Sequence, residues 1–128
     1  MNLKFRYGIW TIFLLAFLAS CTTNNLKVDL QISNEEAPVL LAVEKMIETA
    51  ASANLEISEL NPDLIIAGTI DSTLGSEEAY RIRQKGKNIN VIGGGATGLV
   101  YGLYDVKKYL SEGITEIPDI NETPHYTF

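Results

Sequence analysis

The sequence contains one cysteine and one histidine in 128 residues, and this scarcity excludes several kinds of chemistry. With Cys21 alone, no disulfide can form within the chain, so a small exported domain would depend on its hydrophobic core. His125 is the single histidine, and no cysteine or carboxylate cluster accompanies it to complete a metal site. The zinc-protease pattern H-E-x-x-H is also missing. No Ser-His or Cys-His pair is evident for nucleophilic catalysis. We therefore expect neither a metal nor a cofactor.

Basic residues are also few and scattered along the chain. There are 10 lysines and arginines against 16 aspartates and glutamates. Because two of the basic residues and none of the acidic ones precede Cys21, residues 21–128 carry a formal charge of −8. The sequence shows no basic cluster, which argues against nucleic acid as a partner and against direct adsorption to anionic lipid.

A mostly apolar run of ten residues, 9–18, lies near the N-terminus. Lys4 and Arg6 precede it, and the small residues Ala19 and Ser20 follow. This order predicts a secretory signal peptide over residues 1–20. The run is shorter than the roughly 20 apolar residues of a permanent membrane span.

The segment Leu18-Ala19-Ser20-Cys21 resembles the bacterial lipobox. The resemblance implies that Cys21 becomes the lipid-bearing N-terminus and that residues 21–25 form a short tether. Multiple acyl chains would anchor the protein stably. No acidic residue follows Cys21 directly, so the resemblance favours the outer membrane, with the domain facing the periplasm or the exterior. The alternative is an ordinary secretory signal followed by an unmodified cysteine.

The first half of the mature chain has two periodic segments. Apolar and polar residues alternate from Leu26 to Ile32, as in a half-buried strand. Pro38 fits the first turn of a helix that we expect to end near Ala53-Asn54. The apolar stripe expected to be buried on this helix is Val39, Leu40, Val43, Met46, Ile47 and Ala50.

Strands dominate the next part of the chain. We expect a short strand at Leu55–Ser58, a fully buried one at Asp63–Ala67, and a polar loop over residues 68–77. A hairpin follows, with arms Ala79–Gln84 and Asn88–Ile92. Alternation predicts inward-pointing Tyr80, Ile82, Ile89 and Val91, and outward-pointing Arg81, Arg83 and Asn90.

A second helix follows the hairpin, and the chain is expected to be irregular from Ile114 onward. The buried stripe of the helix is Leu99, Val100, Leu103, Val106 and Leu110. Gly113 can cap its C-terminus. The order of elements predicts an α+β fold, in which both helices cover one small mixed sheet.

Between the hairpin and the second helix, Gly93, Gly94, Gly95 and Gly98 fit the pattern G-x-G-x-x-G. In a dinucleotide-binding turn, this pattern joins a parallel strand to a helix whose N–H groups hold a pyrophosphate. Here the preceding strand is expected to be one arm of an antiparallel hairpin, and too little chain follows for the second half of such a fold. We therefore interpret the glycines as a structural turn that allows close helix–sheet packing.

Three segments of the second half form a recognisable series: Glu78-Ala79-Tyr80-Arg81-Ile82-Arg83, Asn90-Val91-Ile92-Gly93-Gly94 and Gly98 to Val106. The series resembles the N-terminal non-catalytic domain of bacterial alpha-glucuronidases (glycoside hydrolase family 67), and is similar to the second domain of beta-N-acetylhexosaminidases. The resemblance implies a zincin-like α+β fold without the zinc site. The end of the chain, Thr123 to Phe128, resembles the segment that leads into a following catalytic barrel.

In those families the acid/base pair lies on the barrel, and this sequence does not contain the barrel. The resemblance therefore carries over no catalytic residue. No activity is expected from this chain alone. The implied division is a signal peptide (1–20), a tether (21–25), an accessory domain (26–113) and a linker toward a barrel (114–128). The chain would then be a truncated product, the first fragment of a split gene or a free-standing domain.

Tyr101, Tyr104, Asp105 and Lys108 share the side of the second helix opposite its core. Surface tyrosines can stack on sugars, but aromatic residues more often mark an interface with another domain. The leading hypothesis is therefore an accessory domain of a glycoside-hydrolase-like lipoprotein in carbohydrate metabolism. A free-standing glycan- or protein-binding lipoprotein and a nucleotide-binding module are the alternatives.

Overall fold

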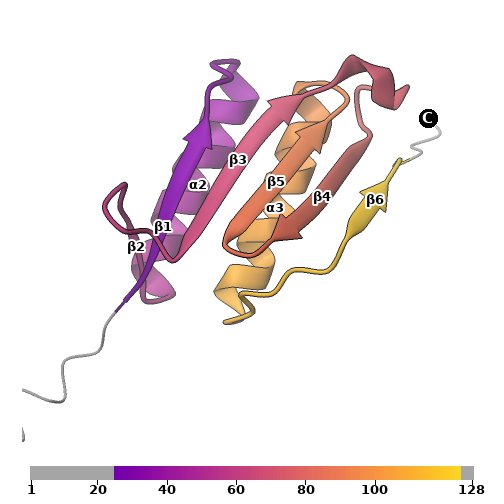
Figure 1. The fold of residues 1–128 in the computed structure, drawn as a ribbon. Coiled ribbons are helices and arrows are strands. Elements are labelled where there is room, and N and C mark those ends of the chain that lie inside the picture. The colour runs from indigo at the N-terminus through magenta and orange to yellow at the C-terminus, as the bar shows by residue number, and fades with distance from the viewer. Residues whose placement is uncertain (1–24, 125–128) are drawn as a thin grey trace, which may run out of the picture.

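A computed structural model describes residues 25–124 of the chain. The predicted signal peptide, Cys21 and His125 lie outside the described residues. The elements are β1 (Leu26–Ile32), α2 (Ala37–Ser52), β2 (Leu55–Ile57), β3 (Leu64–Ile70), a 3-10 turn η1 (Ser72–Leu74), β4 (Tyr80–Lys85), β5 (Asn88–Gly93), α3 (Ala96–Ser111) and β6 (Ile120–Glu122). Figure 1 shows one curved sheet with the two helices behind it.

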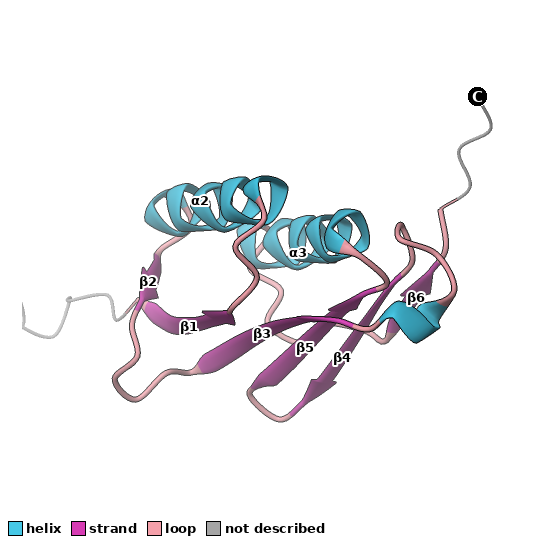
Figure 2. Ribbon diagram, turned by 90° about the horizontal axis from the view of Figure 1, so that it is seen from above, coloured by secondary structure: helices cyan, strands magenta, loops and turns pink. Residues whose placement is uncertain are grey.

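The six strands form one mixed sheet in the order β2-β1-β3-β5-β4-β6. The strands β2, β1, β3 and β5 pair in parallel, whereas β4 pairs antiparallel with both β5 and β6. Both α2 and α3 lie side by side over the same face, and within residues 25–124 no α-helix covers the other face (Figure 2). The predicted α+β fold class, with two helices on a small mixed sheet, is confirmed.

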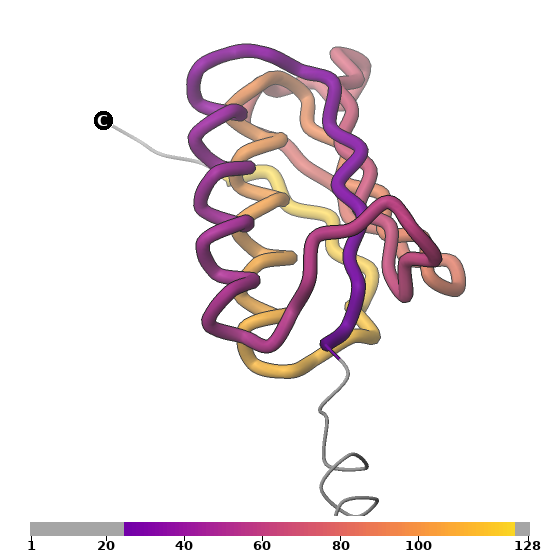
Figure 3. Tube along the Cα trace, turned by 90° about the vertical axis from the view of Figure 1, so that its left-hand side faces the viewer, coloured from indigo at the N-terminus to yellow at the C-terminus, as the bar shows by residue number. Residues whose placement is uncertain are grey.

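Because β2 and β3 flank β1 on opposite sides, the loop over residues 58–63 has to cross β1. Figures 2 and 3 show that it crosses on the face away from the helices. The Asp63 N–H donates to the Lys27 oxygen at 2.8 Å, and the Lys27 N–H donates to Asp63 Oδ2 at 2.9 Å. This loop therefore covers the β1 side of the open face and leaves the β5–β4 side uncovered.

The core lies between the sheet and the helices. Its largest fully buried side chains are Val28, Val39, Ile66, Ile82, Ile89, Val91, Leu99, Leu103 and Val106. The inward residues predicted for the hairpin are buried, and Gly113 ends α3 with a φ of +78° and an N–H bond to the Leu110 oxygen. Hydrophobic burial of this kind supplies most of the stability of a domain without disulfides.

The stripe predicted for α2 is wrong at two positions. Leu40 is 52% exposed and Ile47 is 47% exposed, whereas the buried residues are Val39, Ala42, Met46 and Ala50. These four recur at intervals of three or four residues, so the helix contacts the sheet and α3 along a narrow strip. Helix α2 carries more apolar side chains than its contact with the sheet and α3 covers, so the apolar stripe predicted from the sequence was wider than the buried one.

Three other expectations differ from the structure. The strand that was expected to be fully buried at Asp63–Ala67 is buried only at alternate residues, since Ile65 and Ala67 are partly exposed. Strand β3 continues to Ile70, and η1 lies inside the segment that was expected to be loop from Gly68 to Glu77. The chain after Ile114 is not irregular throughout, because β6 pairs with β4 and Ile117 is only 5% exposed. Residues 117–122 therefore belong to the same packed unit as the rest of the sheet.

Candidate functional site

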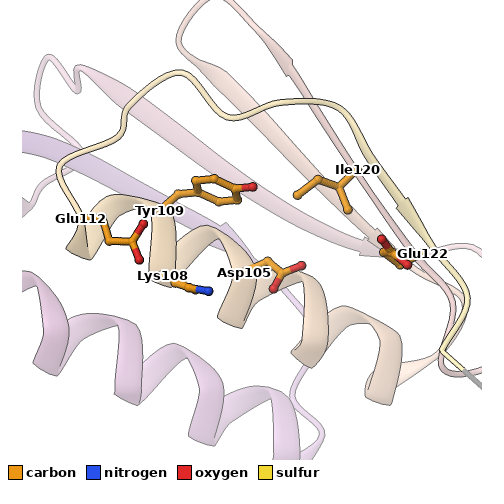
Figure 4. A pocket seen from close by; sticks show the side chains of 6 residues that line it. All are labelled: Asp105, Lys108, Tyr109, Glu112, Ile120 and Glu122. Carbon is orange, nitrogen blue, oxygen red and sulfur yellow. The ribbon is translucent and has the colours of Figure 1, made fainter. Parts of the chain in front are cut away.

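A pocket of about 430 Å³ lies between α3 and β6 (Figure 4). Its lining residues are Asp105, Lys108, Tyr109, Glu112, Ile120 and Glu122. Asp105, Lys108 and Tyr109 lie on α3, and Glu112 is the residue that caps the C-terminus of this helix. The other two are alternate residues of β6. The pocket exists because β6 extends the sheet beyond the edge that the two helices cover (Figure 2).

Hydrogen bonds from β4 fix the segment that carries Ile120 and Glu122. Gln84 Nε2 donates to the Thr115 oxygen at 3.0 Å, and the Ile117 N–H donates to Gln84 Oε1 at 2.6 Å. Arg83 Nη1 donates to the Ile120 oxygen at 3.0 Å. Two polar side chains of β4 thus hold residues 115–120 in place and define one wall of the pocket.

Tyr80 and Asp105 form a partly buried polar contact beside the pocket. Tyr80 is 8% exposed, and its hydroxyl donates to Asp105 Oδ2. Burial, then this hydrogen bond and the negative charges of Asp105 and Glu122, raise the pKa of Tyr80 well above its ordinary value. The phenol stays protonated at physiological pH and keeps one oxygen of Asp105 oriented.

The four side chains that were predicted to contact a partner or glycan are separated by the structure. Asp105 and Lys108 line the pocket. Tyr101 instead packs edge-on against Tyr80, with ring centroids 6.5 Å apart, and the ring of Tyr104 lies 4.7 Å from Lys107 Nζ. Sequence spacing alone missed Tyr109 and Glu112 at the end of α3. It also missed Ile120 and Glu122, because these come from a strand that was not expected.

The pocket carries three carboxylates against one ammonium group. An aromatic ring and one aliphatic side chain complete its lining, so it offers acceptors for hydroxyl groups beside a small apolar surface.

Among the described residues, no group of three or more acidic, histidine or cysteine side chains could hold a metal ion. No helix within residues 25–124 is long and apolar enough to span a membrane.

The glycine-rich turn before α3 is packed against the chain's own backbone. The Gly94 N–H donates to the Ala79 oxygen at 2.7 Å, and the Gly98 N–H donates to the Glu77 oxygen at 2.8 Å. These carbonyls occupy the space at the start of α3 where a pyrophosphate would bind in a dinucleotide-binding turn.

The strand before this turn, β5, was expected to be one arm of an antiparallel hairpin. It does pair antiparallel with β4, but it also pairs in parallel with β3, so that expectation was incomplete.

No protein-family model and no curated protein matches this sequence. The described residues nevertheless have a fold that also occurs in glycoside hydrolases. One solved structure that shares it is a GH138 enzyme targeting pectin rhamnogalacturonan II, with a TM-score of 0.63 and 20% identity over 77% of this chain. Another is a GH115 4-O-methyl-alpha-glucuronidase with specificity for decorated arabinogalactans, with a TM-score of 0.51 and 20% identity over 69% of this chain.

The likeness covers only a small part of each enzyme, 15% of the GH138 chain and 14% of the GH115 chain. At 20% identity it shows the fold alone. The chain is thus like a region of larger glycoside hydrolases. The finer resemblance to the N-terminal domain of family 67 stays a prediction.

Proposed function

We propose that this chain is a non-catalytic accessory domain of a glycoside-hydrolase system in carbohydrate metabolism, attached to the cell envelope through lipid on Cys21. The observation that carries the proposal is the fold likeness to about one seventh of a GH138 enzyme. An accessory role fits a unit of this size, because the likeness covers only 15% of that enzyme's chain. Its carbohydrate context would be a polysaccharide of the kind that enzyme targets.

In this proposal the domain supports and orients a catalytic barrel that is encoded next to it. The outer side of α3 and the segment after β6 would face the barrel. The pocket lies between α3 and β6, and its lining is more polar than that of a domain core. Contacts between domains are commonly of this polar kind.

The DNA that follows the codon for Phe128 tests the accessory role. If the chain is truncated or is the first fragment of a split gene, a frame that encodes a glycoside-hydrolase barrel should lie directly downstream. A terminator followed by unrelated genes would contradict this role. It would favour the second candidate, a free-standing binding lipoprotein that uses the pocket at Asp105 and Lys108.

Lipid attachment has a separate test in the producing bacterium. Replacement of Cys21 by alanine should abolish labelling by a palmitate analogue and should move the protein out of the membrane fraction, because the thiol is the acceptor for the lipid. Ser20→Ala is the matched control, since it keeps a small residue before the cysteine, and it should still be labelled. Equal membrane association of the Cys21→Ala variant would rule out the lipid anchor.

A further inference from the structure

The face of the sheet opposite the helices collects basic side chains that are scattered in the sequence. On β4, Tyr80 and Ile82 are buried under the helices, so the alternate residues Arg81, Arg83 and Lys85 lie on the open face. The neighbouring strand places Asn90 beside Arg83 and Asn88 beside Lys85. Lys87 lies in the turn between the two strands. We name Arg81, Arg83, Lys85, Lys87, Asn88 and Asn90 the basic face.

The basic face reverses the charge of the molecule locally. Residues 21–128 contain eight basic residues, and four of them lie in this one surface of β4, β5 and their turn. Two carboxylates lie near the margin of this face. Asp119 Oδ2 is 3.9 Å from Arg83 Nε. The pKa of Asp71 is lowered mainly by the hydrogen bonds that its carboxylate accepts from Thr73, and to a smaller extent by the positive charge of Arg81. On the opposite layer, the pocket is acidic. The domain is therefore polarised, although its sequence shows no basic cluster.

One donor on this face lacks an acceptor. Arg81 Nε is buried, and it has no hydrogen-bond partner within the described part of the chain. A buried polar atom without a partner costs free energy, and native structures contain few of them. The Nε and Nη groups of a guanidinium form a fork that matches the two oxygens of a carboxylate. The Arg81 guanidinium therefore has unused hydrogen-bonding capacity at the edge of this face.

The spacing of the cations fits a linear ligand. Alternate residues of a strand lie about 6.6 Å apart, so Arg81, Arg83 and Lys85 form a row along β4. The amides of Asn88 and Asn90 lie parallel to this row and can donate to hydroxyl groups. No aromatic ring belongs to this set of residues, so recognition here depends on charge and hydrogen bonds.

We propose that the basic face binds a glycan chain that carries carboxylates, that is, a polysaccharide rich in uronic acid. The choice of a glycan among polyanions rests on the proposed carbohydrate role, whereas the site itself rests on the geometry of β4 and β5. The loop over residues 58–63, with Glu59 and Asp63, projects on the same side as the basic face (Figure 2). A flat anionic bilayer would meet these acids as well, but a narrow chain can follow β4 alone.

Titration of the full-length chain, in a non-ionic detergent, with polygalacturonate tests this proposal. Binding should be measurable at low ionic strength and should weaken as salt is added, because salt screens exposed charges. The double variant Lys85→Gln with Lys87→Gln should bind about 5-fold or more weakly, and Arg81→Gln should weaken binding by a similar factor. The neutral polymer dextran should not bind.

The matched control removes two positive charges from the helix layer, as Lys45→Gln with Lys107→Gln. It should bind polygalacturonate as tightly as the unmodified chain. Equal loss in both double variants would overturn the proposal, since it would show an effect of net charge alone. Tighter binding of anionic vesicles or of a DNA oligonucleotide than of polygalacturonate would also overturn it. Failure of these titrations leaves the downstream frame and the Cys21→Ala result unchanged, so the two proposals can fail separately.

Discussion

Replacement of Gly98 by alanine is expected to destabilise the domain by about 3 kcal/mol or more, at the upper end of the range for overpacking. In the exposed interior of a helix the same change usually stabilises by up to about 1 kcal/mol, so the sign itself is informative. A Cβ atom at this position would overlap the Ala79 carbonyl oxygen and lie 2.9 Å from the Glu77 oxygen. Both atoms belong to backbone that is tied to the turn by hydrogen bonds, so neither can move aside like the end of a side chain.

Urea unfolding of residues 22–128, followed by circular dichroism, measures this change. The control is Gly86→Asn in the β4–β5 turn, where φ is +60° and no atom would lie within 4 Å of the new Cβ. Because asparagine tolerates this left-handed conformation, the control should cost less than about 1 kcal/mol. A loss below about 1 kcal/mol for Gly98→Ala would show that α3 can move away from the Glu77–Ala79 backbone at little cost.

Much of the fold could be predicted because its strongest elements have a clear local period. The alternation from Leu26 to Ile32 gave β1 with its observed bounds, and the hairpin residues took the predicted sides of the sheet. Strand β6 was missed because Ile120-Asn121-Glu122 has one apolar residue and no period of its own. Its conformation depends on pairing with β4 and on hydrogen bonds that the segment makes with Gln84 and Arg83, which are long-range contacts.

The candidate sites show the same division between local and long-range information. Helical spacing predicted Asp105 and Lys108 on one side of α3, and both line the pocket, but the other wall of the pocket comes from β6. The outward direction of Arg81 and Arg83 was also predictable, whereas the position of Arg83 opposite Asn90 depends on strand register. For α2, the sequence could not show that only a narrow strip would meet α3 and the sheet. That is why Leu40 and Ile47 were expected to be buried.

Truncation after Gly113, the predicted end of the accessory domain, should destabilise the chain by about 4 kcal/mol or more, or prevent folding. Loss of the nearly buried Ile117 side chain accounts for about 2–4 kcal/mol, by analogy with isoleucine-to-alanine changes in cores. Gln84 would lose both of its bonds to this segment, and Arg83 would lose the Ile120 oxygen. Strand β4 would become the edge of the sheet, with Ile82 no longer paired with Ile120. Urea unfolding of residues 22–113 and 22–124 measures the difference.

Two point variants of residues 22–128 separate the packing contribution from the effect of shortening the chain. Ile117→Ala should cost about 2–4 kcal/mol, because it leaves a cavity between the sheet and the segment after α3. Glu116→Gln changes an exposed neighbour in the same segment and should stay within about 0.5 kcal/mol. Equal urea midpoints for the two truncated chains would mean that the domain ends at Gly113 and that β6 only rests on it. If the expected loss is found, residues 114–122 serve the domain itself, and only the residues that follow can lead toward a partner.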